Sequence, residues 1–117
     1  MDAKAPEKPM KADVEADPAC PFCRQEVRSR AVAQHGAVLA IPDAHPVADG
    51  HCLVITRRHT PNFFTMTRQE RQDAIELLAI LQRRALDADS TITGFNVGAN
   101  CGDSAGQQVP HAHLHFI

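Results

Sequence analysis

The sequence predicts an α+β domain with an antiparallel sheet and one long helix. Two observations carry this prediction: short apolar segments recur along the chain, and one longer segment has its apolar residues at helical spacing. Most connections between these segments are short, which is typical of an antiparallel meander. The chain of 117 residues is long enough for one such domain and too short for two.

Two apolar segments predict strands on either side of a loop. Residues 37–41 (Ala-Val-Leu-Ala-Ile) form an apolar run that Pro42 ends, and residues 51–56 (His-Cys-Leu-Val-Ile-Thr) are rich in β-branched side chains. Residues 42–50 contain two prolines and Gly50, which are typical of a loop. We therefore expect two strands joined by this loop.

Residues 68–86 form the predicted helix. Thr67 and Glu70 fit a capping box, in which each side chain accepts a hydrogen bond from the backbone N–H of the other residue. Apolar side chains follow at helical spacing and make one stripe: Ala74, Leu77, Leu78, Leu81 and Ala85. Core packing explains this stripe fully, so we assign it no other function.

The last third of the chain predicts a strand, a loop and a final strand. Residues 91–97 form the first of these strands, and residues 98–108 form a polar, glycine-rich loop. In residues 111–117 (His-Ala-His-Leu-His-Phe-Ile) histidines alternate with apolar residues. Successive side chains on a strand point to opposite faces, so one face is apolar and the other carries three imidazoles about 7 Å apart. A histidine tag would lack this alternation.

Charge divides the chain near residue 17. Residues 1–17 hold three lysines and five acidic residues, which account for the net charge of −2, and we predict a disordered charged leader there. The folded domain is expected over residues 18–117, where nine arginines face nine acidic residues. This balance argues against a nucleic-acid-binding surface. No apolar run could span a membrane and no secretion signal opens the sequence, so a cytoplasmic location is the default expectation.

Two of the four cysteines form a Cys-x-x-Cys pair, Cys20 and Cys23. Without a secretion signal, metal binding or redox chemistry is a better interpretation of this pair than a disulfide framework. The two-residue gap lets both thiolates reach one tetrahedral ion. A thioredoxin-like redox motif would require a βαβ context, which the sequence lacks. Cys52 is expected to be a buried apolar thiol.

The loop before the histidines has the composition of a phosphate-binding loop. Its three glycines allow close approach of the backbone to a ligand, and Asn100 and Gln107 add neutral hydrogen-bond donors. Loops of this kind are often only turns, but this one leads directly into the three alternating histidines.

Residues 105–117 resemble the signature of the histidine triad (HIT) nucleotide hydrolases and transferases, His-φ-His-φ-His-φ-φ with φ apolar. Other matching positions lie in order along the chain: Cys-Pro-Phe-Cys at residues 20–23, Asp43, His51 after Gly50, and His59 after Arg58. The resemblance covers about residues 18–117. It implies a five-stranded antiparallel sheet with one long helix, and a homodimer in which two sheets join into one continuous ten-stranded sheet.

The resemblance also implies covalent catalysis at phosphorus. His113 would attack the α-phosphate of a purine nucleotide, and water would hydrolyse the resulting nucleotidyl-histidine. A neutral imidazole nitrogen suits this step if the other ring nitrogen is held by an acceptor, for which we expect a backbone carbonyl. By the same resemblance, His115 and His51 form the relay and phosphate-contacting pair.

Four further residues are candidates for nucleotide binding by resemblance. Asp43 would bind the ribose hydroxyls, Asn100 and Gln107 would hold the phosphates, and Ile41 would help to line the base pocket. Each also has a plainer interpretation, as a polar loop residue or a core aliphatic side chain.

Zinc-bearing members of the family suggest the remaining ligands of a metal site. By analogy, His59 and His111 would complete a Cys₂His₂ site with Cys20 and Cys23. Four filled positions leave no place for a reactive water, so the zinc would be structural. His111 could then not serve as an acid or base.

Three functions remain open from the sequence. The leading hypothesis is a hydrolase of adenosine 5′-phosphoramidates or diadenosine polyphosphates. The second is a zinc-stabilised nucleotide-binding module with little turnover, and the third is a nucleotidyl transferase similar to the galactose-1-phosphate uridylyltransferases. That branch replaces the third histidine with glutamine, so His115 favours hydrolysis. Family members usually continue beyond the triad with Pro-Arg and a tail, whereas this sequence ends at Ile117, which leaves the leaving-group contacts open.

Overall fold

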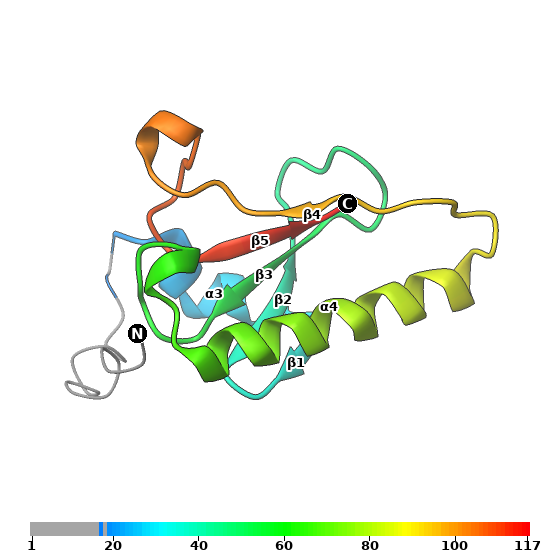
Figure 1. Cartoon of the computed structure of the whole chain (residues 1–117), viewed down its shortest axis with the longest axis horizontal. Coiled ribbons are helices and arrows are strands. Elements are labelled where there is room, and N and C mark those ends of the chain that lie inside the picture. The colour runs from blue at the N-terminus through cyan, green and yellow to red at the C-terminus, as the bar shows by residue number, and fades with distance from the viewer. Residues whose placement is uncertain (1–16, 18) are drawn as a thin grey trace.

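The computed structural model describes residue 17 and residues 19–117, so the predicted leader lies outside the described residues except for Asp17. Five antiparallel strands form one sheet, in the order β1-β2-β3-β5-β4, and the long helix α4 (Arg68–Ala88) crosses one face of it (Figure 1). The strands are β1 (Ala33–His35), β2 (Val38–Pro42), β3 (Cys52–Thr56), β4 (Val97–Gly98) and β5 (His113–Phe116). The short helix α3 (Gln25–Arg28) and the 3₁₀ turns η1 (Pro21–Cys23), η2 (Phe63–Thr65) and η3 (Asp103–Ala105) complete the elements of the described residues. The predicted fold class is confirmed.

Strand β5 occupies an interior position in the sheet although it is the last strand in the sequence. It pairs with β3 on one side, with His113 opposite Ile55 and His115 opposite Leu53. On the other side it pairs with β4, with His115 opposite Gly98. Backbone pairing therefore holds His115 on both sides and His113 on the side of β3.

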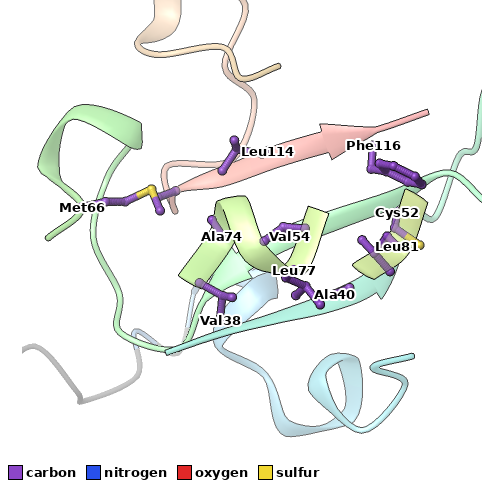
Figure 2. Close-up of a cluster of buried hydrophobic side chains, with 11 residues drawn as sticks. Val38, Ala40, Cys52, Val54, Met66, Ala74, Leu77, Leu81, Leu114 and Phe116 are labelled. Atoms are coloured by element: carbon purple, nitrogen blue, oxygen red, sulfur yellow. The ribbon is translucent and has the colours of Figure 1, made fainter. Parts of the chain in front are cut away.

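The two faces of the sheet bury different sets of side chains. On one face, Ala112, Leu114 and Phe116 pack with Leu77 and other residues of α4, and Figure 2 shows this cluster between the helix and the strands. The opposite face buries a second cluster that joins the strands to the N-terminal segment: Cys20, Phe22, Cys23, Leu39, Ile41, Leu53 and Ile55. The predicted alternation along the histidine strand is thus confirmed for its apolar side, and Cys52 is buried in the first cluster as expected.

Helix α4 begins as predicted and ends two residues later than predicted. The Thr67 hydroxyl accepts from the Glu70 N–H at 2.9 Å, and the Glu70 carboxylate accepts from the Thr67 N–H at 2.8 Å. The same carboxylate receives two hydrogen bonds of 2.9 Å from the Arg58 guanidinium, which follows β3. This ion pair is largely buried and connects the start of the helix to the sheet.

The prediction of a strand over residues 91–97 is wrong except at its last residue. The Thr91 N–H and hydroxyl both donate to the Asp89 carboxylate, which forms a turn directly after the helix. Strand pairing begins only where Asn96 and Ile117 exchange two backbone hydrogen bonds of 2.9 Å. Regular pairing then covers β4 alone.

Three other details differ from the sequence prediction. The elements α3 and β1 were not predicted, because neither shows a clear apolar period. Strand β5 begins at His113 and not at His111, since the Ala112 N–H donates to the Thr60 carbonyl at 2.7 Å.

Among the described residues, no helix is both long and apolar enough to cross a bilayer.

Candidate functional site

His113 stands at the start of β5 with one ring nitrogen already bonded. Its Nδ1–H donates to the backbone carbonyl of His111 at 2.7 Å. In the neutral ring this leaves the lone pair on Nε2. The ring of Phe22 meets the His113 ring edge to face, with centroids 5.2 Å apart, and the His113 side chain is buried. The carbonyl and the phenyl ring together restrict the orientation of this imidazole.

His115 lies beside His113 and contacts His51. The ring centroids of His113 and His115 are 5.4 Å apart and the rings meet edge to face, closer than the spacing of about 7 Å between alternate residues of a strand. The His51 Nε2 lies 3.2 Å from the His115 Nδ1. Burial, together with the neighbouring histidines His113 and His51, lowers the pKa of His115. The structure therefore brings together the three histidines that the resemblance names as catalytic.

Asp43 lies next to His51 because the pairing of β2 and β3 continues one step into the loop. The Asp43 N–H donates to the His51 carbonyl at 3.0 Å. A carboxylate oxygen of Asp43 approaches the His51 Nε2 to 3.2 Å. On the other side of the His51 ring, the Val47 N–H donates to Nδ1 at 3.0 Å.

A cleft of about 490 Å³ opens in front of these histidines. Clefts of this size accommodate small-molecule ligands. The apolar part of its lining comes from Pro21, Phe22, Leu53 and Val109. The polar part includes Asp43, His45, Asn100, Gln108, His113 and His115. The N-terminal segment and the loop before β5 lie at the same end of the sheet in Figure 1, which is why both contribute to one cleft.

The four candidate nucleotide-binding residues occupy different positions relative to this cleft. Asp43 and Asn100 line it. Ile41 is buried in the second cluster, where it pairs with Leu53 across β2 and β3. The Gln107 amide holds the loop together: its Nε2 donates to Pro61 O and Val109 O, at 2.6 and 2.8 Å, and its Oε1 accepts from the Gly102 N–H at 2.7 Å. Ile41 and Gln107 therefore lie outside the lining of the cleft.

Cys20, Cys23, His59 and His111 converge although they are far apart in the sequence. The His111 Nδ1 lies 3.3 Å from Cys20 Sγ, 3.6 Å from Cys23 Sγ and 3.3 Å from His59 Nδ1. Cys23 Sγ is also 3.3 Å from His59 Nδ1. Ligand atoms around a tetrahedral zinc, at usual Zn–S and Zn–N lengths, are separated by about 3.3–3.8 Å. The four side chains could hold zinc with little movement.

The protonation of His111 also suits a metal ligand. Its Nε2–H donates to the Thr56 carbonyl at 2.7 Å, so the lone pair of the neutral ring is on Nδ1, facing the sulfur atoms. Burial lowers the pKa of His111 to about 4, which keeps the ring neutral at pH 7. Burial also raises the pKa of the Cys20 thiol to about 11, so a metal must displace its proton.

Three contributors to the site were not identified from the sequence. Thr56 orients His111, the Val47 N–H fixes the proton of His51, and Phe22 contacts the rings of both His111 and His113. Thr56 is a polar residue at the end of an apolar segment, which is a weak sequence signal for a buried hydrogen-bonding role. The Val47 contribution comes from the backbone and has no sequence signal.

Comparisons with known proteins agree with this geometry. The sequence model of one family, the HIT domain, matches residues 24–117. An uncharacterised HIT-like protein of Mycoplasma pneumoniae is 38% identical over 101 residues, covering 84% of this chain and 69% of the relative. The protein named hit of Bacillus subtilis is 33% identical over 101 residues, with the same two shares. The chain belongs to the HIT domain family, whose members generally bind and act on nucleotides.

Solved structures show the same fold. A hypothetical histidine triad nucleotide-binding protein from Sulfolobus tokodaii superposes with a TM-score of 0.74 at 30% identity, covering 84% of this chain and 67% of that one. A HIT family protein from Bacillus anthracis superposes with a TM-score of 0.75 at 33% identity, covering 88% of this chain and 74% of that one.

Proposed function

We propose that this protein is a nucleotide hydrolase that cleaves at the nucleoside α-phosphate through a covalent nucleotidyl-histidine. The observation that carries the proposal is the 2.7 Å hydrogen bond from His113 Nδ1–H to the His111 carbonyl. It leaves the Nε2 lone pair of a cleft-lining imidazole available for attack. The geometry of His113 therefore supports its assignment as the nucleophile.

The reaction takes place in two displacements. His113 Nε2 attacks the α-phosphorus, the P–N bond forms, and the bond to the leaving group breaks as that group takes a proton from His115. Water then gives a proton back to His115 as it attacks the phosphorus, the P–N bond breaks, and the nucleoside monophosphate leaves. His51 supports His115 through the 3.2 Å contact between their ring nitrogens. Dividing one displacement into two is the general advantage of covalent catalysis.

The cleft supports binding of a purine nucleotide. Phe22, Leu53 and Val109 offer an apolar wall for the base, and Ile41 supports this wall from the neighbouring strand, beside Leu53. We assign the ribose hydroxyls to the Asp43 carboxylate. The phosphates are assigned to the loop before β5, where Asn100 contacts the ligand and Gln107 holds the loop in shape.

We assign a structural zinc ion to Cys20, Cys23, His59 and His111. The separations of 3.3–3.6 Å between their ligand atoms and the orientation of His111 support this assignment. When bound, zinc would clamp the N-terminal segment to the start of the histidine strand. Phe22, which lies between the two cysteines in the sequence, contacts the His113 ring, so the clamp would also hold this contact in place.

A homodimer is proposed on the basis of the family resemblance. Strand β4 is an edge of the sheet, and the Val97 side chain on it is half exposed. A second copy that pairs along this edge would join two sheets into ten strands. Size-exclusion chromatography with light scattering tests this; a monomer at micromolar concentration would contradict it.

The decisive experiment compares two substrates and two histidine variants. Adenosine 5′-phosphoramidate and a diadenosine polyphosphate are incubated separately with wild type, His113→Ala and, as a control, His35→Ala, which lies on β1 and bonds to Glu76. We expect AMP release by wild type and the control only, and mass spectrometry of acid-quenched enzyme should find an adenylyl group on His113. The faster substrate identifies the leaving group.

Either of two outcomes would contradict the proposed hydrolase activity and indicate another function. Nucleotide binding without turnover of either substrate would indicate a binding module. AMP transfer to an added sugar phosphate in preference to water would indicate a transferase.

A further inference from the structure

The carboxylate of Asp43 lies against the two histidines proposed to handle the proton of the leaving group. Asp43 and His51 face each other at the ends of β2 and β3, joined by a 3.0 Å backbone hydrogen bond. Both have the strand parity of Leu53, which pairs with His115 across β3 and β5. The three polar side chains therefore share the face of the sheet that borders the cleft.

A single N–H of His51 faces two acceptors. Because the Val47 N–H donates to His51 Nδ1 at 3.0 Å, that nitrogen carries no proton, and the neutral ring has its proton on Nε2. His51 Nε2 lies 3.2 Å from Asp43 Oδ2 and 3.2 Å from His115 Nδ1. These two acceptors are 4.0 Å apart. At equal distances the charged carboxylate is the stronger acceptor, so in the free protein it holds most of this N–H.

The acceptor that His51 uses decides which nitrogen of His115 carries a proton. If His115 Nδ1 accepts from His51, the proton of the neutral His115 ring is on Nε2, where it can be given to a leaving group. If Asp43 holds the His51 proton, nothing directs the His115 proton to Nε2. Burial lowers the pKa of His115, which keeps the ring in the neutral form in which this choice matters.

The oxygen of Asp43 that faces His51 is also the one that accepts no backbone hydrogen bond from the described residues, so it is the better placed of the two for a ligand. Asp43 Oδ1 accepts from the His45 N–H at 2.8 Å, and the residue lines the cleft beside His115. Building on the proposed function, we infer that Asp43 is a positioning residue that couples ribose binding to the proton of His115. A ribose hydroxyl that donates to Asp43 Oδ2 competes with the His51 N–H for this oxygen, so the N–H shifts to His115 Nδ1, and His115 presents its own Nε2–H to the leaving group. No covalent bond changes; one N–H changes its acceptor.

Kinetics with a modified sugar test the coupling. Adenosine 5′-phosphoramidate and its 2′,3′-dideoxy analogue are compared with wild type and Asp43→Ala. In wild type, kcat for the dideoxy substrate should fall about tenfold, the population ratio expected between a charge-assisted and a neutral hydrogen bond. In Asp43→Ala the competing acceptor is gone, so kcat for the dideoxy substrate should rise about tenfold above the wild-type value.

Asp43→Ala is therefore expected to raise kcat for the dideoxy substrate and to raise KM for adenosine 5′-phosphoramidate. Asp43→Asn, which keeps an acceptor for the His45 N–H, should behave similarly and guards against a folding defect in the alanine variant. Asp49→Ala, exposed on the same loop, is the matched control. If Asp43 only binds ribose, its replacement leaves kcat for the dideoxy substrate unchanged, and that result overturns the inference.

Nitrogen-15 NMR of the histidine rings tests the same coupling without turnover. Saturating adenosine should move His115 Nε2 to the protonated shift, whereas 2′,3′-dideoxyadenosine should not, and Asp43→Ala should show that shift without ligand. Unchanged His115 shifts at saturation, or no binding of adenosine, would overturn the inference. A ligand-dependent shift in a protein that releases no AMP would instead contradict the hydrolase proposal and leave the coupling intact.

Discussion

His59 is the most exposed of the four proposed zinc ligands, with 24% of its side chain accessible. Cys20, Cys23 and His111 are buried and contribute to packing as well as to the metal site. Replacement of His59 by alanine therefore removes a ligand with little loss of core contacts. Any large change in stability would then report on the metal itself.

The expected loss of stability follows from the affinity of the site for zinc. A ligand that binds only the folded state stabilises it by about 4 kcal/mol when its free concentration is about 1,000 times Kd. With only three ligands the site is no longer saturated with zinc, and the folded state loses this stabilisation. For a domain of about 100 residues, each kcal/mol shifts Tm by roughly 4–8 °C. We therefore expect His59→Ala to lower the Tm of the zinc-loaded protein by about 15–30 °C.

Elemental analysis measures the zinc content, and thermal unfolding followed by circular dichroism measures Tm. Wild type, His59→Ala and the exposed control His45→Ala are each heated with excess zinc and with a chelator. The chelator should lower the Tm of wild type and the control to near that of His59→Ala, and should barely change His59→Ala. A wild-type protein that carries no zinc, and whose Tm responds to neither zinc nor chelator, would refute the assignment of the metal site.

Three other outcomes are expected. Glu70→Ala should lower the free energy of unfolding by about 3–5 kcal/mol, because it breaks a buried ion pair with Arg58; urea unfolding measures this, with exposed Gln72→Ala as the control. Gln107→Ala should raise KM for the nucleotide at least severalfold, because the loop loses three hydrogen bonds; an unchanged KM would show that the loop holds its shape without them. The metal-free protein should lose stability as pH rises from about 9 to about 11, because burial raises the pKa of Cys20 to about 11 and the folded state then resists ionisation of this thiol. Urea unfolding at several pH values checks this prediction. A metal-free Cys20→Ala variant should lose less stability over that range.

Local patterns predicted the elements whose stability is local or strictly periodic. The Thr67 and Glu70 capping box marks the start of α4, and its apolar stripe faces the sheet as expected. Alternation in residues 111–117 predicted which side of the last strand is apolar. These predictions hold because a capping box is made by near neighbours, and the side-chain period that marks one apolar face can be read from the local sequence.

The strand prediction over residues 91–97 failed because strand formation there depends on a neighbouring strand, which the local sequence does not show. Its β-branched residues favour a strand, but Asp89 captures the start of the segment in a turn. Pairing partners exist only from Asn96 onward, where Ile117 lies alongside. Strand propensity has no effect where no neighbouring strand is available.

The sequence by itself determined that three histidines alternate on a strand, that a Cys-x-x-Cys pair precedes them, and that one capped helix covers a sheet. Only the tertiary structure decided what those histidines can do. In three of the rings a backbone group directs the proton: the His111 carbonyl for His113, the Thr56 carbonyl for His111, and the Val47 N–H for His51. Two of these three groups belong to residues outside the histidine strand. The Thr56 carbonyl reaches His111 because strands distant in sequence pair side by side, and the Val47 N–H reaches His51 because the loop between β2 and β3 folds back toward it. No local pattern records which hydrogen-bond partner a packed ring will meet.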